Sequence, residues 1–216
     1  MRTVKYTLLI LSLFVFTGIC FANVLPMSVS DIPKESIGLY QTDKIITVYS
    51  EPDESSAVLY RREVNYSDFT DVDEDGFFAI LLPKKELGYA YITDVADDEN
   101  WVQIVYNKDR NLKGWIYKND DFQFLPWGIF FDMYGRKYGI YQLKNPPADY
   151  NEIFSQPNPS GQLMGQISRP KFIRMTSIEG TWMLVTVLNP YDSTTTGYIQ
   201  WRTGDGEILL FPAIKD

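Results

Sequence analysis

The fold is decided by the stretch Asn100-Trp101-Val102-Gln103-Ile104-Val105, which is followed by Gly114-Trp115-Ile116. A second stretch repeats its order, with Thr181-Trp182-Met183-Leu184-Val185-Thr186 followed by Gly197-Tyr198-Ile199. Each run after its tryptophan is rich in β-branched and apolar residues, which is typical of a short β-strand. The chain therefore carries the same strand pattern twice.

Further landmarks extend this repeat in both directions. Upstream, Ile37-Gly38-Leu39-Tyr40-Gln41 recurs as Tyr138-Gly139-Ile140-Tyr141-Gln142, and Val48-Tyr49-Ser50-Glu51-Pro52 recurs as Ile153-Phe154-Ser155-Gln156-Pro157. Downstream, the two copies close on Leu125-Pro126 and Phe211-Pro212. Because all the landmarks recur in one order, we interpret the chain as an internal duplication.

The rest of the sequence also predicts strands. Helical spacing of apolar residues is hard to find after the N-terminal segment, whereas short runs of Val, Ile, Tyr, Phe and Thr alternate with Gly, Pro, Asn and Asp. The predicted strands are 45–49, 77–82, 89–95, 101–106, 114–117, 123–125, 172–177, 182–188, 197–201 and 207–211. Strands this short and closely spaced favour an all-β fold made of small antiparallel barrels.

The landmarks follow one order: aromatic-Ser-x-Pro, a variable stretch, Trp-Val-x-Ile, a turn, and Gly-Trp-Ile. This order resembles the bacterial SH3-like (SH3b) domain. The chain would carry two such domains in tandem, covering most of residues 37–216. The resemblance implies two small, strongly bent β-barrels, the first in residues 23–126 and the second, with the connector, in 127–216. It also implies cell-wall binding. In related architectures such domains accompany cell-wall peptidases that use cysteine and histidine, and that catalytic part has no counterpart here.

The two copies differ in length, and the connector between them is aromatic. The spacing of the landmarks places an insertion in the first copy near residues 65–88, where a barrel loop tolerates extra length. The connector carries Phe122, Phe124, Trp127, Phe130, Phe131, Tyr134, Tyr138 and Tyr141. So much aromatic surface predicts burial between the two barrels, which would fix their relative orientation.

The N-terminal segment has the pattern of a secretory signal peptide. Arg2 and Lys5 precede an apolar run over residues 8–16, and a short exit leads to predicted cleavage after Ala22. The run is shorter than the roughly 20 residues of a membrane-spanning helix. Lipoprotein anchoring at Cys20 is the alternative, which Ile19 disfavours because that recognition pattern has a small residue there. We expect an exported protein of the periplasm or cell exterior.

The composition excludes several kinds of chemistry. The formal net charge is −8, and removal of Arg2 and Lys5 with the leader would make it −10. This balance disfavours nucleic acid and anionic lipid as partners. The chain has no histidine, and its one cysteine lies in the leader, so imidazole and thiol catalysis and zinc sites built on them are excluded. Carboxylate chemistry and oxygen-ligand metal sites stay open.

Three groups of residues are candidates for a site. Nine aromatic residues could form a stacking surface for a sugar or a cleft for a peptide. We single out seven of them as ligand-binding candidates, with Tyr117 and Tyr198 as the other two: Tyr89, Tyr91, Tyr106, Trp115, Trp127, Tyr191 and Trp201. For any one of them, core packing is the alternative.

The other two groups are acidic. Asp71, Asp73 and Asp75, followed by Gly76, match the first half of a calcium-binding loop, but Leu82 stands where a bidentate glutamate belongs. An acidic Asp-Gly turn is the alternative. Asp94, Asp97, Asp98 and Glu99 precede Trp101 and could serve a glycosidase or form a solvated turn.

These observations predict a non-catalytic binding module of the cell envelope that recognises peptidoglycan, through its peptide or glycan, or an envelope protein. The first alternative is an interaction or inhibitor protein that docks on a basic secreted enzyme, with salt-sensitive binding. The second is a carboxylate-based glycoside hydrolase. No cofactor is expected other than calcium, and the oligomeric state stays open.

Overall fold

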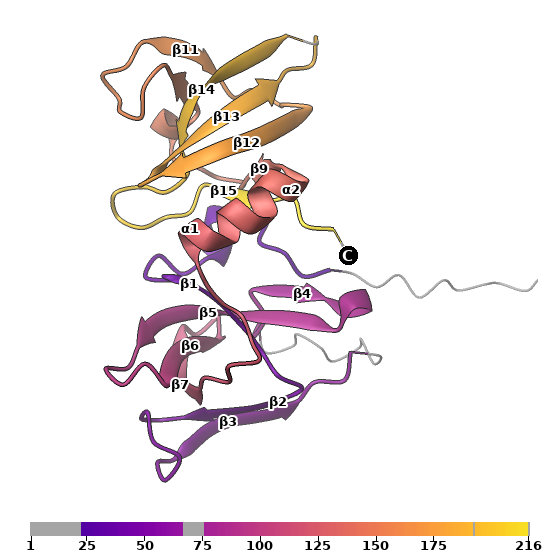
Figure 1. The fold of residues 1–216 in the computed structure, drawn as a ribbon, viewed down its shortest axis with the longest axis vertical. Helices are drawn as coiled ribbons and strands as arrows, with labels where there is room; N and C mark the ends of the chain where they lie inside the picture. The colour runs from indigo at the N-terminus through magenta and orange to yellow at the C-terminus, as the bar shows by residue number, and fades with distance from the viewer. Residues whose placement is uncertain (1–22, 67–75, 192, 216) are drawn as a thin grey trace, which may run out of the picture.

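The computed structural model describes residues 23–66, 76–191 and 193–215, so the predicted leader lies outside the described residues. The chain forms two antiparallel β-sheets at opposite ends of the molecule, with a helical segment between them (Figure 1). Within the described residues, no helix is long and apolar enough to cross a membrane. The prediction of a mostly β protein is confirmed.

Each sheet is built from one half of the chain. The first contains β1 Gly38–Gln41, β2 Ile45–Tyr49, β3 Val58–Glu63, β4 Ile80–Leu82, β5 Leu87–Val95, β6 Trp101–Asn107, β7 Leu112–Tyr117 and β8 Phe124–Pro126. The second contains β9 Ile140–Gln142, β10 Glu152–Phe154, β11 Leu163–Gln166, β12 Phe172–Glu179, β13 Trp182–Leu188, β14 Thr194–Gln200 and β15 Leu210–Pro212. We call these halves the first and second units.

The two sheets have the same topology. The first has the order β3-β2-β7-β6-β5-β1-β8, with β4 beside β5, and the second has the order β11-β10-β14-β13-β12-β9-β15. If β4 is left out and the strands of each sheet are numbered in chain order, every strand of the first sheet has a counterpart at the same place in the second. The sequence repeat is therefore matched by a repeat of strand order.

The irregularities of the sheets recur as well. The ladder shifts register between Val48 and Tyr49 in β2 and at the corresponding place in β10. A second shift occurs in β5 and again in its counterpart β12. After β2 and β10, the two serines of the repeated Ser-x-Pro turn each donate a backbone hydrogen bond of 2.9 Å across the hairpin. Since bulges bend a strand and redirect its side chains, both units bend at equivalent positions.

The expected closure into barrels is not seen, and this part of the fold prediction needs correction. Among the described residues, neither sheet closes on itself: β3 and β8 are the edges of the first, and β11 and β15 are the edges of the second. Strand β8 ends on Pro126, and β15 ends on Pro212. A proline has no N–H to donate to a further strand, so it limits pairing at the edge where it stands.

A helical segment corrects the expectation of a purely β chain. It consists of α1 Trp127–Phe130, a π-helical turn η3 Phe131–Gly135 and α2 Arg136–Tyr138. Its aromatic residues at 127, 130, 131 and 134 have the i, i+3, i+4, i+7 spacing that places side chains on one helix face. The sequence therefore contains a helical pattern in this connector, for which the aromatic content alone predicted burial between the two units. The remaining short helices are the 3₁₀ turns η1 Val29–Asp31, η2 Pro83–Lys85 and η4 Ala148–Tyr150.

The helical segment joins the two units through a common core. Trp127, Phe130 and Phe131 are buried. The Phe131 ring lies 4.8 Å from that of Trp201 in the second unit, and the Trp127 ring lies 6.2 Å from that of Tyr91 in the first. One continuous cluster of buried residues contains members of both sheets, and a smaller cluster fills the first unit alone.

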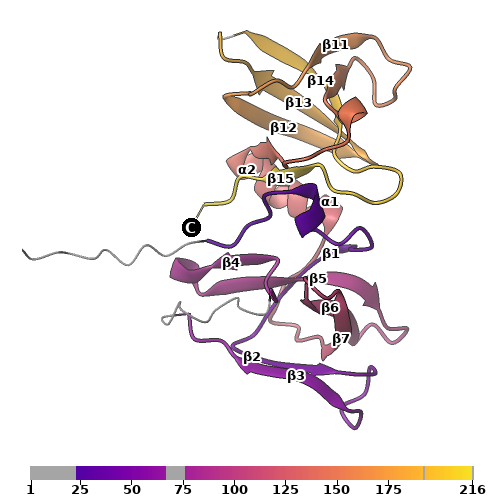
Figure 2. The same cartoon turned by 180° about the vertical axis from the view of Figure 1, so that it is seen from behind.

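Residues 23–37, which we call the N-terminal strap, run between the two sheets (Figure 2). Val24 forms a bridge with Leu81 of the first unit. Further along, the strap exchanges backbone hydrogen bonds of 3.1 and 2.8 Å with Lys144 of the second unit. The guanidinium of Arg202 donates to the carbonyl oxygens of Lys34 and Ser36, each at 3.0 Å. The strap thus holds both units together.

The units differ most between their third and fourth shared strands. In the second unit, residues 167–171 connect β11 to β12, whereas in the first unit residues 64–86 connect β3 to β5 and include β4 and η2. Phe77 and Phe78 of this longer connection are fully buried. The residues of the predicted insertion that the structure describes therefore add to the core of the first unit.

Candidate functional site

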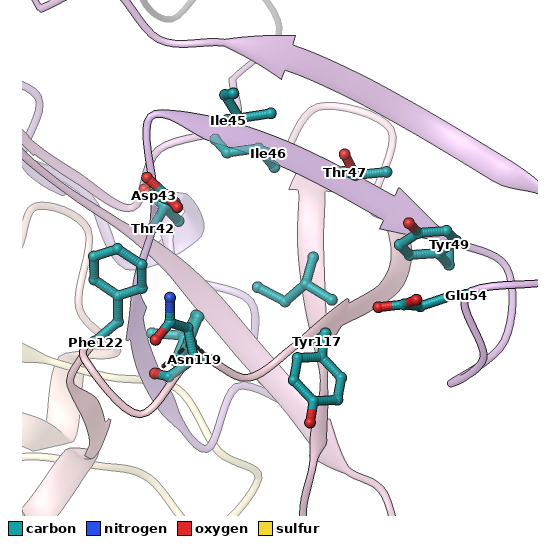
Figure 3. A pocket seen from close by; sticks show the side chains of 12 residues that line it. Thr42, Asp43, Ile45, Ile46, Thr47, Tyr49, Glu54, Tyr117, Asn119 and Phe122 are labelled. Atoms are coloured by element: carbon teal, nitrogen blue, oxygen red, sulfur yellow. Dashed lines mark hydrogen bonds between the residues drawn. The ribbon is translucent and has the colours of Figure 1, made fainter.

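A pocket opens on the first unit between β2, β7 and the loop that follows β7 (Figure 3). Its volume is about 250 Å³. Successive side chains of a strand point to opposite faces, and in β2 this buries Ile46 and Val48 in the core while Ile45, Thr47 and Tyr49 are turned away from it. These three outward residues line the pocket.

Two tyrosines of the pocket rest on one buried tryptophan. The ring of Tyr49 lies 5.6 Å from that of Trp101 at 87°, and the ring of Tyr117 lies 5.4 Å from it at 86°. Trp101 opens β6 directly opposite Tyr117 in the ladder. Edge-to-face pairs of this kind stabilise the positions of the rings. The side chain of Tyr117 is nevertheless 55% exposed, so it offers surface to a ligand.

A glycine allows β2 and β7 to approach closely enough to form this wall. A Cβ atom on Gly114 would meet the Val48 side chain and would lie 2.9 Å from the carbonyl oxygen of Tyr49. Any larger residue would push β2 away from β7. The glycine of the Gly-Trp-Ile landmark is thus required by the close packing of two strands.

The other end of the pocket is formed by the loop after β7. The hydroxyl oxygen of Tyr40 accepts a hydrogen bond from the backbone N–H of Asn119 at 2.6 Å. It also donates to the carbonyl oxygen of the same residue at 3.2 Å. Burial raises the pKa of Tyr40, so the hydroxyl keeps the proton that it donates. These bonds hold the loop in place, and Phe122 closes this end of the pocket.

Two carboxylates flank these aromatic walls. Figure 3 shows Glu54 beside Tyr49 at one end and Asp43 near Phe122 at the other. Both acidic residues are exposed, and no ion pair of either one is found in the described part of the chain.

Two nearby lysines have other partners. Lys44 forms an ion pair of 2.8 Å with Glu86, outside the pocket. Lys118 lies over the ring of Phe124, 5.8 Å from its centroid. The pocket therefore combines aromatic and apolar walls with two exposed carboxylates that form no ion pair within the described residues.

The second unit keeps the scaffold of this site without its chemistry. Phe154 lies 5.8 Å from Trp182 at 82°, as the matching pair does in the first unit. Opposite Trp182, the ladder places Gln200 where the first unit has a tyrosine. In the repeated turn after β10, Pro159 stands where the first unit has its glutamate. The polar aromatic and the carboxylate at this end are therefore specific to the first unit.

The aromatic candidates from the sequence lie mainly elsewhere. Four of the seven are buried, with exposed fractions between 1% and 5%: Tyr89, Tyr91, Trp127 and Trp201. Tyr106 and Trp115 are partly buried, and Tyr191 is 94% exposed in the turn after β13. None of the seven lines the pocket, whereas Tyr117, also considered from the sequence, does.

Tyr49 and Phe122 were missed as site residues. The signal for Tyr49 was available, because period-two alternation in 45–49 places it on the face opposite the core residues. Phe122 gave no such signal, since its position follows from the hydrogen bonds that hold the loop after β7.

Of the two acidic groups predicted from the sequence, the structure describes the second. Asp71, Asp73 and Asp75 of the predicted calcium loop lie outside the described residues; Gly76, which follows them, has φ of +61°. In the ranges that the structure describes, no three Asp, Glu, Cys or His side chains gather to hold a metal ion. Asp97, Asp98 and Glu99 are exposed in the turn between β5 and β6.

A scan against protein-family models finds no match for this chain, and a search of curated proteins finds no significant match either.

Proposed function

We propose that this chain is an exported, non-catalytic binding module of the bacterial cell envelope, built of two tandem SH3-like units. It holds its ligand in the pocket between β2 and β7 of the first unit. The observation that carries this proposal is the pocket itself, which is lined by two tyrosines supported by Trp101 and by the exposed carboxylates of Asp43 and Glu54. Pockets of this kind, with apolar walls and a few polar groups, are typical of ligand sites.

The SH3-like assignment is supported by the position of the landmarks. In both units the tryptophan opens the central strand of the sheet, and the Ser-x-Pro turn follows the strand that pairs with the glycine-containing strand. The glycines have one role in the two units, since a Cβ on Gly197 would lie 2.5 Å from the carbonyl oxygen of Phe154. A shared strand order with shared landmarks fits two copies of one domain.

Export and the absence of catalysis are supported by the sequence. The leader pattern in residues 1–22 predicts secretion. The chain after this leader has neither cysteine nor histidine, which removes the nucleophile and base of the cell-wall peptidases that such domains accompany. The SH3b resemblance supplies the cell-wall expectation, with peptidoglycan or an envelope protein as the ligand.

A second function is favoured by the charge of the pocket. Free carboxylates beside aromatic rings also suit a basic protein surface, so the chain could act by docking on a basic secreted enzyme. Binding of that kind weakens steeply with salt, because charge complementarity accelerates association. Binding to a basic protein without retention on purified sacculi would favour this second function.

Co-sedimentation with purified peptidoglycan sacculi tests the proposal. We expect the wild-type chain to be retained, the Tyr117→Ala variant to lose most of this retention, and the Gln200→Ala variant to behave as wild type. Gln200 is the matched control because it occupies the equivalent position opposite Trp182. Equal retention of both variants would exclude the pocket as the site. A wild-type chain that ignores sacculi would remove the cell-wall function.

A further inference from the structure

We propose that the pocket recognises an extended peptide segment with two basic side chains, one bound at each end of the pocket. This inference rests on the proposed function and names its ligand class. Each end of the pocket combines a carboxylate with aromatic side chains: Glu54 with Tyr49 and Tyr117 at one end, and Asp43 with Phe122 at the other. A carboxylate beside an aromatic ring attracts an ammonium or guanidinium group through its charge and through the ring face.

The carboxylates favour a cation over a neutral ligand. Docking any ligand here removes water from Glu54 and Asp43, and a charge that loses water without gaining a partner is costly. No lysine or arginine of the described residues forms an ion pair with either carboxylate. A cationic ligand would supply the ion-pair partner that both carboxylates lack within the described part of the chain.

The dimensions favour two side chains on an extended backbone. Strand β2 runs along the pocket between its two ends, from Ile45 to Tyr49. At roughly 3.3 Å per residue, these four steps span about 13 Å. In an extended ligand, residues four apart have the same separation and point to the same side. The volume of about 250 Å³ is below the roughly 300–1,000 Å³ of sites for drug-sized molecules, which suits side chains.

Calorimetric titration of the full chain with a defined peptide tests the inference. The probe is an acetylated and amidated peptide in which three glycines separate two lysines, and the comparison probe carries both lysines as acetyl-lysine. We expect the acetylated probe to bind at least tenfold more weakly. Glu54→Gln and Asp43→Asn should each weaken binding of the lysine probe by about two- to fivefold, as expected for one exposed cation–aromatic or ion-pair contact.

The matched control is Glu51→Gln. Glu51 is exposed in the same hairpin turn as Glu54 and does not line the pocket. Both changes remove one negative charge, so an effect of overall charge would weaken binding equally in the two variants. We expect Glu51→Gln to bind the lysine probe as the wild type does. Equal binding of the two probes, or equal weakening by Glu51→Gln and Glu54→Gln, would overturn the inference.

The source of the basic side chains is decided by a second experiment. Retention on sacculi that disappears after chemical acetylation of their amino groups would assign the lysine-like groups to cell-wall peptides. Binding to a basic polypeptide without retention on sacculi would assign them to a protein and would remove the cell-wall function while leaving the ligand class intact. Conversely, retention that depends on Tyr117 and survives acetylation would overturn the cationic ligand and leave the proposed function standing.

Discussion

Replacement of Gly114 by alanine should destabilise the chain and open the pocket. The new Cβ would meet the Val48 side chain, lie 2.9 Å from the carbonyl oxygen of Tyr49 and lie 3.2 Å from Leu59. Two of these neighbours belong to β2, so the strand must move away from β7. Overpacking of this kind costs about 1–3 kcal/mol. For a chain of this length, that lowers the Tm by about 2–12 °C.

Two other glycines supply controls, one at the equivalent place in the second unit and one in the helical segment. Gly197→Ala should cost a similar amount, because its Cβ would lie 2.7 Å from the Ile153 side chain as well as against the backbone of Phe154. Gly128 lies in α1 with no atom within 4 Å of the position of its Cβ, so Gly128→Ala should stabilise the chain by about 0.5–1 kcal/mol through helix propensity.

The assay is thermal unfolding followed by circular dichroism, combined with a titration of the lysine probe. Both crowded variants should melt below the wild type, whereas only Gly114→Ala should weaken binding, since only this change lies beside the pocket. If Gly114→Ala and Gly197→Ala melted with the wild type, the close approach of the strands would be refuted. If Gly197→Ala weakened binding as strongly as Gly114→Ala, the location of the site in the first unit would be refuted.

Three further predictions concern the packing of the units and the effect of pH. Arg202→Ala should cost roughly 1–3 kcal/mol, because it removes the two hydrogen bonds that the charged guanidinium donates to Lys34 and Ser36 of the N-terminal strap; urea unfolding measures this, and an unchanged midpoint would contradict it. Phe131→Ala should cost about 3–5 kcal/mol, because it truncates a buried aromatic side chain. Its neighbour Trp201 belongs to the second unit. The variant should therefore lower the midpoint of a single unfolding transition shared by both units, and two separate transitions would contradict this. Burial raises the pKa of Tyr66 to about 12, whereas an unfolded tyrosine titrates near about 10. The unfolded chain therefore releases this proton first, and stability should fall as the pH rises from about 10 to 12; urea midpoints at pH 9 and 11 measure the fall, and Tyr66→Phe should reduce it.

Much of the strand content could be predicted from local sequence. Strands β2 and β13 have the predicted bounds, because their β-branched runs end at clear turn residues. Strands β1, β3, β9, β10 and β11 were not predicted. Most are only three or four residues long, which is too short for alternation to be distinguished from chance. Strand β9 is held by pairing with β12 and β15, which are distant in the sequence, and not by local propensity.

The helical segment shows a different kind of failure. The spacing of Trp127, Phe130, Phe131 and Tyr134 fits one helix face, but the same residues also suit strands, where aromatics are common. The segment forms a helix and not a strand because two sheets pack on the same short connector, and the aromatic residues of the helix contact both units. This competition between local propensities is settled by tertiary packing.

By itself, the sequence determined that the protein is mostly β, that its landmarks occur twice, and that imidazole catalysis is excluded, since the chain has no histidine. These properties depend on composition and on spacing along the chain. Only the tertiary structure decided where the pocket lies, because the pairing of β2 with β7 and the hydrogen bonds of the following loop bring Tyr117 and Phe122 to Asp43, Tyr49 and Glu54. It also decided which aromatic residues are buried in the shared core and which stay accessible to a ligand. Burial depends on which strands become neighbours, and that choice is a property of the whole fold.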